Sequence, residues 1–172
     1  MIEKNTIQKV LDAFFVQPSA KFHLRELSRL LNLSMPTIIS ATDGLAKKGL
    51  ILKIKSRVVT QVNANRENPI FTYNKRIDNI DRVYGSGILE YLSATYNHPK
   101  LITLFGSYSR GEDIEESDVD IAIVTTRRLH LDLSKYEKKL NRKVSIHEFS
   151  LENLGNDFKA NLANGIVLEG SW

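Results

Sequence analysis

The period of the hydrophobic pattern changes partway along the chain, and this change limits the available folds more strongly than any other feature. Residues 6–48 carry apolar side chains at the spacing of amphipathic helices, whereas short apolar runs alternate with helical segments from residue 101 onward. With 172 residues the chain is long enough for two small cores. We therefore predict an α+β protein, with a mainly helical N-terminal part and a C-terminal part built on a small mixed sheet.

Three helices are predicted in the N-terminal part. The first covers residues 6–16 and the second covers residues 23–31. Ser34 is a good N-cap for the third helix, which has Pro36 in its first turn and ends near Gly49. Strands are expected next, at residues 50–54, 58–62 and 70–73.

This order of three helices followed by strands resembles the winged helix-turn-helix family. The resemblance covers roughly residues 5–74, and its best local marker is the segment at residues 45–51. It implies a module in which the third helix enters the major groove of double-stranded DNA and the strands form a β-wing. Use of the module for dimerisation or protein docking is the alternative, and a homodimer is left open.

The predicted DNA contacts come from the third helix and the wing. The side chains expected to face DNA are Thr37, Ser40, Lys47, Lys48, Lys53, Lys55, Arg57 and Arg66. Residues 1–96 hold 14 Lys and Arg against 8 Asp and Glu, a net charge of +6, and residues 97–172 have a net charge of −2. A basic front half suits a polyanionic partner, and an acidic back half suits a bound cation.

A connecting helix is expected between the two parts. It covers residues 77–96 and is interrupted or bent at Gly85-Ser86-Gly87. We therefore place a winged-helix domain at residues 1–76 and a second domain at residues 97–172. The second domain is predicted to contain strands at 101–105, 119–124 and 144–149 and helices at 107–111, 131–140 and 151–162.

Several features of the sequence argue for a cytoplasmic protein. The chain has no cysteine, which excludes disulfides and thiolate metal sites and fits a reducing compartment. No apolar run is long enough to span a bilayer, so no membrane partner is expected. The N-terminal residues lack the apolar core of a signal peptide.

Two aspartates lie at the start of the strand predicted at residues 119–124. Residues two apart in a strand point to the same face, so Asp118 and Asp120 present their carboxylates together. Two adjacent ionised carboxylates repel each other unless a cation lies between them. Mg²⁺ is the natural cofactor, with Mn²⁺ as an alternative, because carboxylates and substrate phosphates are its usual ligands.

Gly106-Ser107 supplies a complementary phosphate site. The pair follows a strand and opens a helix, where free backbone N–H groups hold a phosphate. Gly106 permits close approach of the backbone. Arg110, one helical turn further on, is placed to neutralise triphosphate charge or to orient a carboxylate. The predicted nucleotide-binding residues are therefore Gly106, Ser107 and Arg110.

Gly-Ser, ten further residues and Asp-x-Asp form a pattern that resembles the DNA polymerase beta-like nucleotidyltransferase superfamily. Gly-Ser-Tyr-Ser-Arg-Gly followed by Ser-Asp-Val-Asp resembles its minimal nucleotidyltransferase branch, over about residues 85–170. The resemblance implies that Asp118 and Asp120 are catalytic and bind metal, and that the Gly-Ser turn binds the triphosphate. A nucleoside monophosphate is then transferred and pyrophosphate is released.

The sequence departs from this superfamily at one position. The resemblance implies a third carboxylate on a later strand, and the matching position falls on Ser145. His147 is expected on the same face as Ser145, and Glu148 on the opposite face. Either the third acid is missing, or His147 serves as base or metal ligand, or an irregular strand brings Glu148 round. The departure bears on turnover more than on binding of nucleotide and metal.

Two functions remain open on these grounds. The first is a metal-dependent transferase that moves a nucleoside monophosphate, with AMP from ATP expected, to a hydroxyl group of a protein or small molecule. Because minimal nucleotidyltransferases often pair with a HEPN-type toxin and modify it, a toxin–antitoxin role is an expectation at family level. The alternative is a DNA-binding transcriptional regulator whose nucleotidyltransferase domain binds a nucleotide without turnover.

Overall fold

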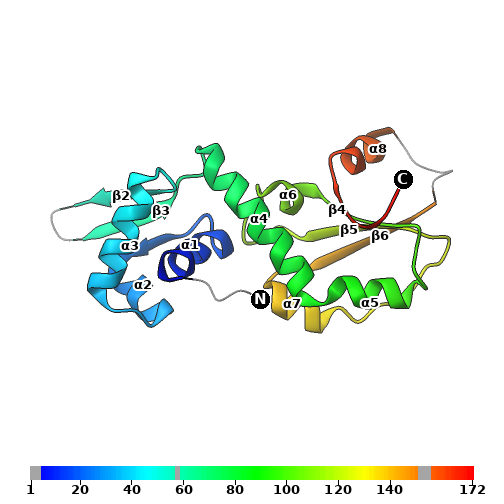
Figure 1. Ribbon diagram of the computed structural model, residues 1–172, viewed down its shortest axis with the longest axis horizontal. Helices are drawn as coiled ribbons and strands as arrows, with labels where there is room; N and C mark the ends of the chain where they lie inside the picture. Colours follow the sequence, from blue (N-terminus) through cyan, green and yellow to red (C-terminus); the bar gives the residue numbers. More distant parts are fainter. Residues whose placement is uncertain (1–4, 57–58, 151–155) are drawn as a thin grey trace. The chain divides into compact units, whose positions relative to one another are not determined.

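Two compact units, Met1–Lys75 and Arg76–Trp172, make up the computed structural model of this protein (Figure 1). The structure describes residues 5–56, 59–150 and 156–172. Helices occur together with two sheets, so the predicted α+β class is confirmed. None of the helices in the described ranges combines the length and the apolar character that a membrane span requires.

The three helices of the first unit agree closely with the predicted ones. They are α1 (Thr6–Val16), α2 (Leu24–Leu31) and α3 (Met35–Lys47). Ser34 caps α3, because its hydroxyl accepts a hydrogen bond from the backbone N–H of Thr37 at 3.3 Å. Just beyond α3, Gly49 has a left-handed φ of +70°, which glycine adopts without steric cost and which ends the helix.

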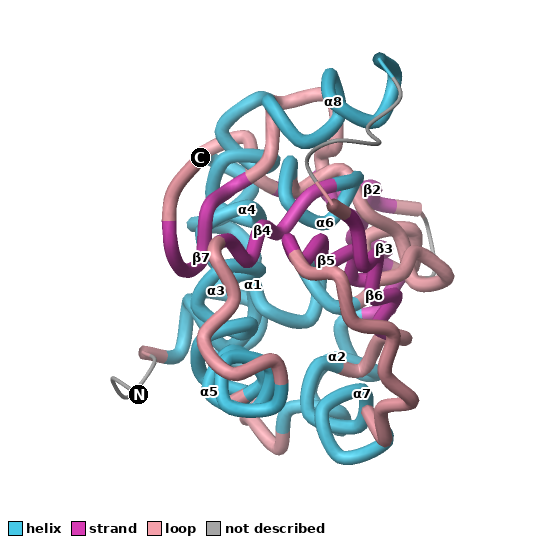
Figure 2. Tube along the Cα trace, turned by 90° about the vertical axis from the view of Figure 1, so that its right-hand side faces the viewer, coloured by secondary structure: helices cyan, strands magenta, loops and turns pink. Residues whose placement is uncertain are grey.

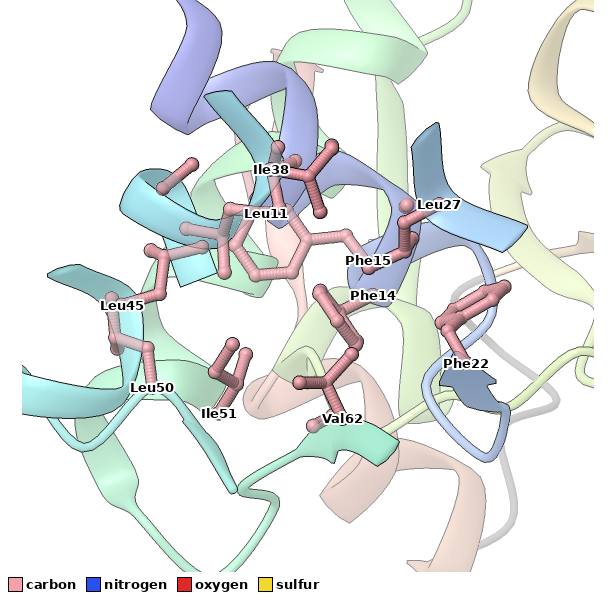
Figure 3. Close-up of a cluster of buried hydrophobic side chains, with 14 of the residues drawn as sticks. Leu11, Phe14, Phe15, Phe22, Leu27, Ile38, Leu45, Leu50, Ile51 and Val62 are labelled. Carbon is pink, nitrogen blue, oxygen red and sulfur yellow. The ribbon is translucent and has the colours of Figure 1, made fainter. Parts of the chain in front are cut away.

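A three-stranded antiparallel sheet completes the first unit. Its strands β1 (Lys21–His23), β2 (Ile51–Lys55) and β3 (Thr60–Ala64) lie in the order β1-β3-β2. Figure 3 shows the core that the helices and this sheet enclose, with Phe14 and Phe15 in the middle of the view and Phe22 toward its right-hand edge. The rings of Phe14 and Phe22 meet edge-on with centroids 5.5 Å apart. The three-residue strand β1 was not predicted.

The strand predicted at residues 70–73 is wrong, because these residues begin the helix α4 (Pro69–Ser86). Pro69 suits the first position of a helix, and the side-chain oxygen of Asn68 accepts a hydrogen bond from the N–H of Ile70 at 2.9 Å. The helical conformation places Phe71 in the core, where its ring centroid lies 5.3 Å from that of Phe15. Periodicity alone does not separate a strand from a helix in such a short apolar run.

The expected interruption of the connecting helix is present. Helix α4 ends at Ser86 and helix α5 (Ile88–Thr95) follows, separated by Gly87 with a left-handed φ of +80°. Helix α4 contributes Phe71 to the core of the first unit and Val83 to that of the second. The predicted domain limits, with a linker at residues 77–96, stay a prediction.

The second unit is built on a mixed sheet, as predicted, and this sheet has four strands where three were expected. Its strands β4 (Leu101–Phe105), β5 (Val119–Val124), β6 (Val144–Phe149) and β7 (Ile166–Gly170) lie in the order β6-β5-β4-β7 (Figure 2). Strands β5 and β6 are parallel, and the other two pairs are antiparallel. The first three strands have the predicted limits, whereas the edge strand β7 was not predicted.

Helices cover the two faces of this sheet unequally. The short helix α6 (Gly106–Arg110) lies at the end of β4, and α7 (Ser134–Leu140) and α8 (Asn156–Ala163) complete the unit. Side chains of α4, α5 and α7 form the main core with one face of the sheet. On the other face, Leu162 of α8 packs against Phe105 and Ala122. Figures 1 and 2 show α8 on the side of the sheet opposite α5 and α7.

Candidate nucleotidyltransferase site

The glycine-serine turn lies directly against the second aspartate of the pair. Strand β4 ends at Phe105, which pairs with Asp120 across the antiparallel β4–β5 ladder. Gly106 then has a left-handed φ of +74°, and a Cβ atom placed on it would lie 2.3 Å from Oδ2 of Asp120. No real Cβ atom approaches an oxygen so closely, so only glycine lets the turn and the carboxylate lie in contact.

Strand β6 provides a hydrogen-bond donor for each aspartate. In the parallel β5–β6 register Asp120 pairs with Ser145. The Ser145 hydroxyl donates to Oδ2 of Asp118 at 2.8 Å, and Nε2 of His147 lies 3.3 Å from Oδ1 of Asp120. The structure thus brings Asp118, Asp120, Ser145 and His147 together at one end of the sheet, on the same face.

Partial burial affects the ionisation of Asp120. Burial raises the pKa of this carboxyl group above its ordinary value. The hydrogen bond and charge of His147 lower the pKa, and the charge of Asp118 raises it further. The His147 ring also meets the buried Phe105 ring edge-on, with centroids 5.1 Å apart. A cation beside the two aspartates would relieve the cost of keeping both of them ionised.

Glu148 does not take the place of a third carboxylate in the site. The β5–β6 ladder continues without a shift to the pair of Val124 and Phe149, so no irregularity turns Glu148 toward the aspartates. Its carboxylate instead accepts hydrogen bonds from the Tyr96 phenol at 2.5 Å and from the backbone N–H of Leu129 at 2.8 Å. Burial and this carboxylate raise the pKa of Tyr96, so the phenol remains protonated and donates.

Arg110 lies at the end of α6 and is exposed. Its Nε atom donates to Glu112 at 2.7 Å, in an ion pair whose side chains are both about half exposed. The N–H of Glu112 in turn donates to the carbonyl oxygen of Ser107 at 3.0 Å. Arg110 therefore orients a carboxylate of its own loop in this structure, and an exposed pair of this kind contributes little to stability.

The residues present fit a divalent cation that is shared with a substrate. Among the described residues, no group of three or more His, Asp or Glu side chains is arranged to hold a metal ion by itself. Two same-face carboxylates beside a turn for phosphates nevertheless match the way Mg²⁺ binds, through one or two carboxylates plus phosphate oxygens. Asp118 and Asp120 are the ligands that the chain would provide.

The residues predicted to contact DNA differ in their surroundings. Ser40, Lys47, Lys48, Lys55 and Arg66 are exposed, and Thr37 is half-buried with its hydroxyl 2.7 Å from that of Ser34. Lys53 is turned onto α3, where its Nζ donates to Asp43 at 2.7 Å and to Thr42 at 3.2 Å. Only 10% of the Lys53 side chain is exposed. Arg57 lies outside the described residues.

Sequence reasoning missed a buried polar cluster beside the site. The side chains of Asn79, Asp113 and Arg142 come from α4, from the loop after α6 and from the residues before β6, and all three are buried. One pattern in the sequence points to this cluster, because Asn79 occupies a position of α4 where helical periodicity expects an apolar residue. The partners of such a residue depend on tertiary contacts that periodicity does not contain.

Comparison with known proteins supports the chemistry of the second unit. Residues 87–171 match the model of the family described as "Polymerase beta, Nucleotidyltransferase". The matched range includes α5, the four-stranded sheet, the Gly106-Ser107 turn and the Asp118–Asp120 pair, and it supports the nucleotidyltransferase superfamily for this unit. At family level the match indicates transferase activity with a nucleoside triphosphate as substrate. No curated protein and no solved structure matched the chain.

Proposed function

We propose that the second unit transfers a nucleoside monophosphate, AMP from ATP, to a hydroxyl group of a protein or small molecule. The observation that carries the proposal is the contact between the Gly106 backbone and the Asp120 carboxylate, where no side chain fits. A triphosphate held by the turn would meet a cation held by the aspartates at this contact. The family match over residues 87–171 supports the same chemistry.

Each part of the site has a role in this reaction. The backbone N–H groups that open α6 and the Ser107 hydroxyl bind phosphate oxygens. Asp118 and Asp120 hold Mg²⁺ or Mn²⁺, and a bound ion supplies positive charge that offsets the charge developing on the phosphates. Arg110 is exposed beside the turn and exchanges Glu112 for an outer phosphate.

The transfer itself is a displacement at the α-phosphorus. The acceptor oxygen forms a bond to this phosphorus while the bond from phosphorus to the pyrophosphate oxygen breaks. Pyrophosphate leaves with the electrons of that bond, and the proton of the acceptor hydroxyl passes to water. Ser145 carries no charge that would take up this proton, so we expect nucleotide binding to be strong relative to turnover.

Labelled ATP tests the proposal directly. The full chain is incubated with α-labelled ATP, Mg²⁺ and the product of the neighbouring gene, for which a HEPN-type toxin is the expected acceptor. Label should move to the acceptor with one pyrophosphate released for each label. Asp118→Asn should abolish the transfer, whereas Asp81→Asn, the same change at an exposed position of α4, should leave it intact. Absence of label with every nucleoside triphosphate would contradict the proposal.

The first unit favours a second function, DNA binding by a winged helix-turn-helix module. Three helices precede the β2–β3 hairpin, and Ser40, Lys47 and Lys48 of α3 and its C-cap are exposed. A transcriptional regulator of this kind is compatible with the transferase, because a fused protein is able to repress its own operon and to modify a partner. Lys53 is less available for DNA than these three residues, since Asp43 already binds it.

Mobility shift of promoter-proximal DNA at several salt concentrations, with and without ATP, tests this second function. Replacing Lys47 and Lys48 together by Ala removes up to two phosphate contacts, and the slope of log affinity against log salt should fall by up to about 2. Lys53→Ala is the matched control, because its ammonium group is bound to Asp43 and a smaller change is expected. Binding that is independent of salt, or unchanged in the double variant, would overturn the assignment.

A further inference from the structure

A loop joins the Gly106-Ser107 turn to the Asp118–Asp120 pair, and a buried carboxylate anchors this loop. Residues 111–117 lead from α6 to Asp118, and Asp113 lies in the middle of this loop. Asp113 is 1% exposed, although the residue before it, Glu112, is exposed. A carboxylate is removed from water in this way only when hydrogen bonds or charges replace its hydration.

Asn79 of α4 is the first group that replaces this hydration. Its amide nitrogen donates to Oδ1 of Asp113 at 2.7 Å and to the carbonyl oxygen of Tyr108 at 2.8 Å. An amide nitrogen carries two hydrogens, so both bonds form at the same time. Tyr108 belongs to α6, which starts with the Gly106-Ser107 turn. One buried side chain therefore holds both the phosphate helix and the loop that follows it.

Arg142 is the second group, and it ties the loop to the other side of the site. Its guanidinium lies 3.4 Å from Oδ2 of Asp113, and the two side chains are 3% and 0% exposed. Arg142 is followed by Lys143, whose carbonyl oxygen accepts the N–H of Val119 at 2.8 Å. The ion pair is thus located where β5, with the aspartates, meets β6, with Ser145.

We infer that Asn79 is a positioning residue, which with Asp113 and Arg142 sets the Gly106-Ser107 turn against the Asp118–Asp120 pair. This inference rests on the proposed function of that pair and turn. The phosphate turn and the metal ligands are separated by ten residues, so an unanchored loop would allow the two halves to drift apart. Catalytic geometry tolerates displacements of only about half an ångström, and buried hydrogen bonds to the loop supply that restraint.

Asn79→Ala tests the inference, and Asn74→Ala is its matched control. Asn74 is an exposed residue of the same helix, and its amide donates to the carbonyl oxygen of Ile70 within α4. Backbone hydrogen exchange is measured on the full chain without nucleotide, and the affinity for a non-hydrolysable ATP analogue with Mg²⁺ is measured separately. If Asn79→Ala does not fold, Asn79→Ser removes the same amide with a smaller change in polarity.

The expected result is local opening. Exchange of the amides at residues 106–117 should accelerate about tenfold or more in the Asn79 variant, while those of β4 and β5 keep their protection. Affinity for the analogue should fall about tenfold, and Asn74→Ala should change neither quantity. Equal acceleration throughout the sheet shows a purely structural role and overturns the inference, as does unchanged exchange in the loop.

The two measurements separate the inference from the function on which it rests. If the wild-type chain binds no nucleotide but the loop opens in the Asn79 variant, the proposed function fails and Asn79 still positions the loop. If nucleotide binds equally well to the variant and the wild type, the nucleotide binding on which the proposed function depends stands and the positioning role is rejected.

Discussion

Gly106 and Gly44 both lie in helices, yet adding a methyl group should have opposite effects on the stability of the fold at the two positions. At Gly106 it would be strained by a φ of +74° and would meet Asp120 at 2.3 Å, whereas nothing lies within 4 Å of a Cβ at Gly44. We expect Gly106→Ala to lower the free energy of unfolding by about 1–3 kcal/mol and Gly44→Ala to raise it by about 0.5–1 kcal/mol. Urea unfolding measures both changes.

Binding of an ATP analogue with Mg²⁺ should also differ between Gly106→Ala and Gly44→Ala. Gly106→Ala should weaken it at least about tenfold because the added methyl group displaces the Asp120 carboxylate. Gly44→Ala should leave it unchanged. Equal affinity of the two variants would show that the contact between the turn and Asp120 is irrelevant to binding.

The raised pKa of Asp120 predicts a pH dependence of stability. Its carboxyl group holds a proton more tightly in the folded than in the unfolded state, so its ionisation costs stability above the folded pKa and costs nothing well below the ordinary value of 3.8. In metal-free buffer, Asp120→Asn should therefore raise the Tm at pH 7, and the gain should shrink as the pH falls toward 3.8.

Asp132 provides a control of opposite sign. Hydrogen bonds from Ser134 lower the pKa of Asp132, so its ionised form stabilises the fold at neutral pH and this contribution disappears as the pH falls through the lowered pKa. Asp132→Asn should lower the Tm slightly at pH 7. If Asp120→Asn lowered the Tm at pH 7 as Asp132→Asn does, this result would contradict burial as the cause of the raised pKa of Asp120.

Ser145 marks the position where a third carboxylate is missing. Ser145→Asp would place a negative charge close to Asp118, which the serine hydroxyl now contacts at 2.8 Å. We expect this variant to unfold at a lower temperature than Ser145→Asn without divalent cations, because like charges repel. Added Mg²⁺ should raise its Tm more than that of the wild type, in a thermal scan at fixed salt. An Mg²⁺ effect no larger than in Ser145→Asn would argue against a cation between the aspartates.

Strand periodicity was enough to place the two aspartates on one face, but it did not determine their neighbours. Asp118 and Asp120 are two residues apart, so any extended conformation aligns their side chains. The contact of Ser145 with Asp118, 27 positions apart in sequence, depends on the parallel register of β5 and β6. Local pattern contains no information on that register, and Asn79 was missed for the same reason.

At the scale of elements, the first turn of α3 offers a clean test of local stabilisation. Ser34 caps α3 through the N–H of Thr37. Ser34→Ala should lower the free energy of unfolding by about 1 kcal/mol, since it leaves a backbone donor without this acceptor. Ser40→Ala, at an exposed position within the same helix, should change it by no more than about 0.5 kcal/mol. Urea unfolding followed by circular dichroism compares the two, and equal losses would show that the cap contributes nothing.

Elements with continuous apolar runs were predictable, and those with ambiguous runs were not. Strands β4 and β5 were predicted with their observed limits because each is a mostly buried apolar run bounded by polar or turn residues. Strand β6 was predicted because apolar and polar side chains alternate along its first four residues. The segment at residues 70–73 has a short apolar run that fits a helix as well as a strand. Pro69 favours the helix, because proline suits the first helical position. Strand β7 is an edge strand whose pairing with β4 is non-local.

At the scale of the whole molecule, the division between the two units falls inside α4. The first unit ends at Lys75, whereas α4 continues to Ser86. A fragment of residues 1–75 keeps fewer than two turns of this helix, and such short helices are marginal in water. A fragment of residues 1–86 should therefore melt at a higher temperature than residues 1–75. Equal melting temperatures in circular dichroism would show that the second half of α4 does not support the first.

The continuity of α4 also restricts which insertions and deletions the chain tolerates. An insertion or deletion in a flexible linker is usually harmless, but each residue added to a helix rotates everything beyond it by about 100°. Phe71 and Asn79 lie on the same helix, one in the core of the first unit and the other bound to the loop of the site. An insertion between Phe71 and Lys75, or between Asp78 and Asn79, would rotate one buried residue of a unit away from the other by about 100°. Recombination is therefore expected to be tolerated only at breakpoints that keep the buried residues of each unit in their present spacing.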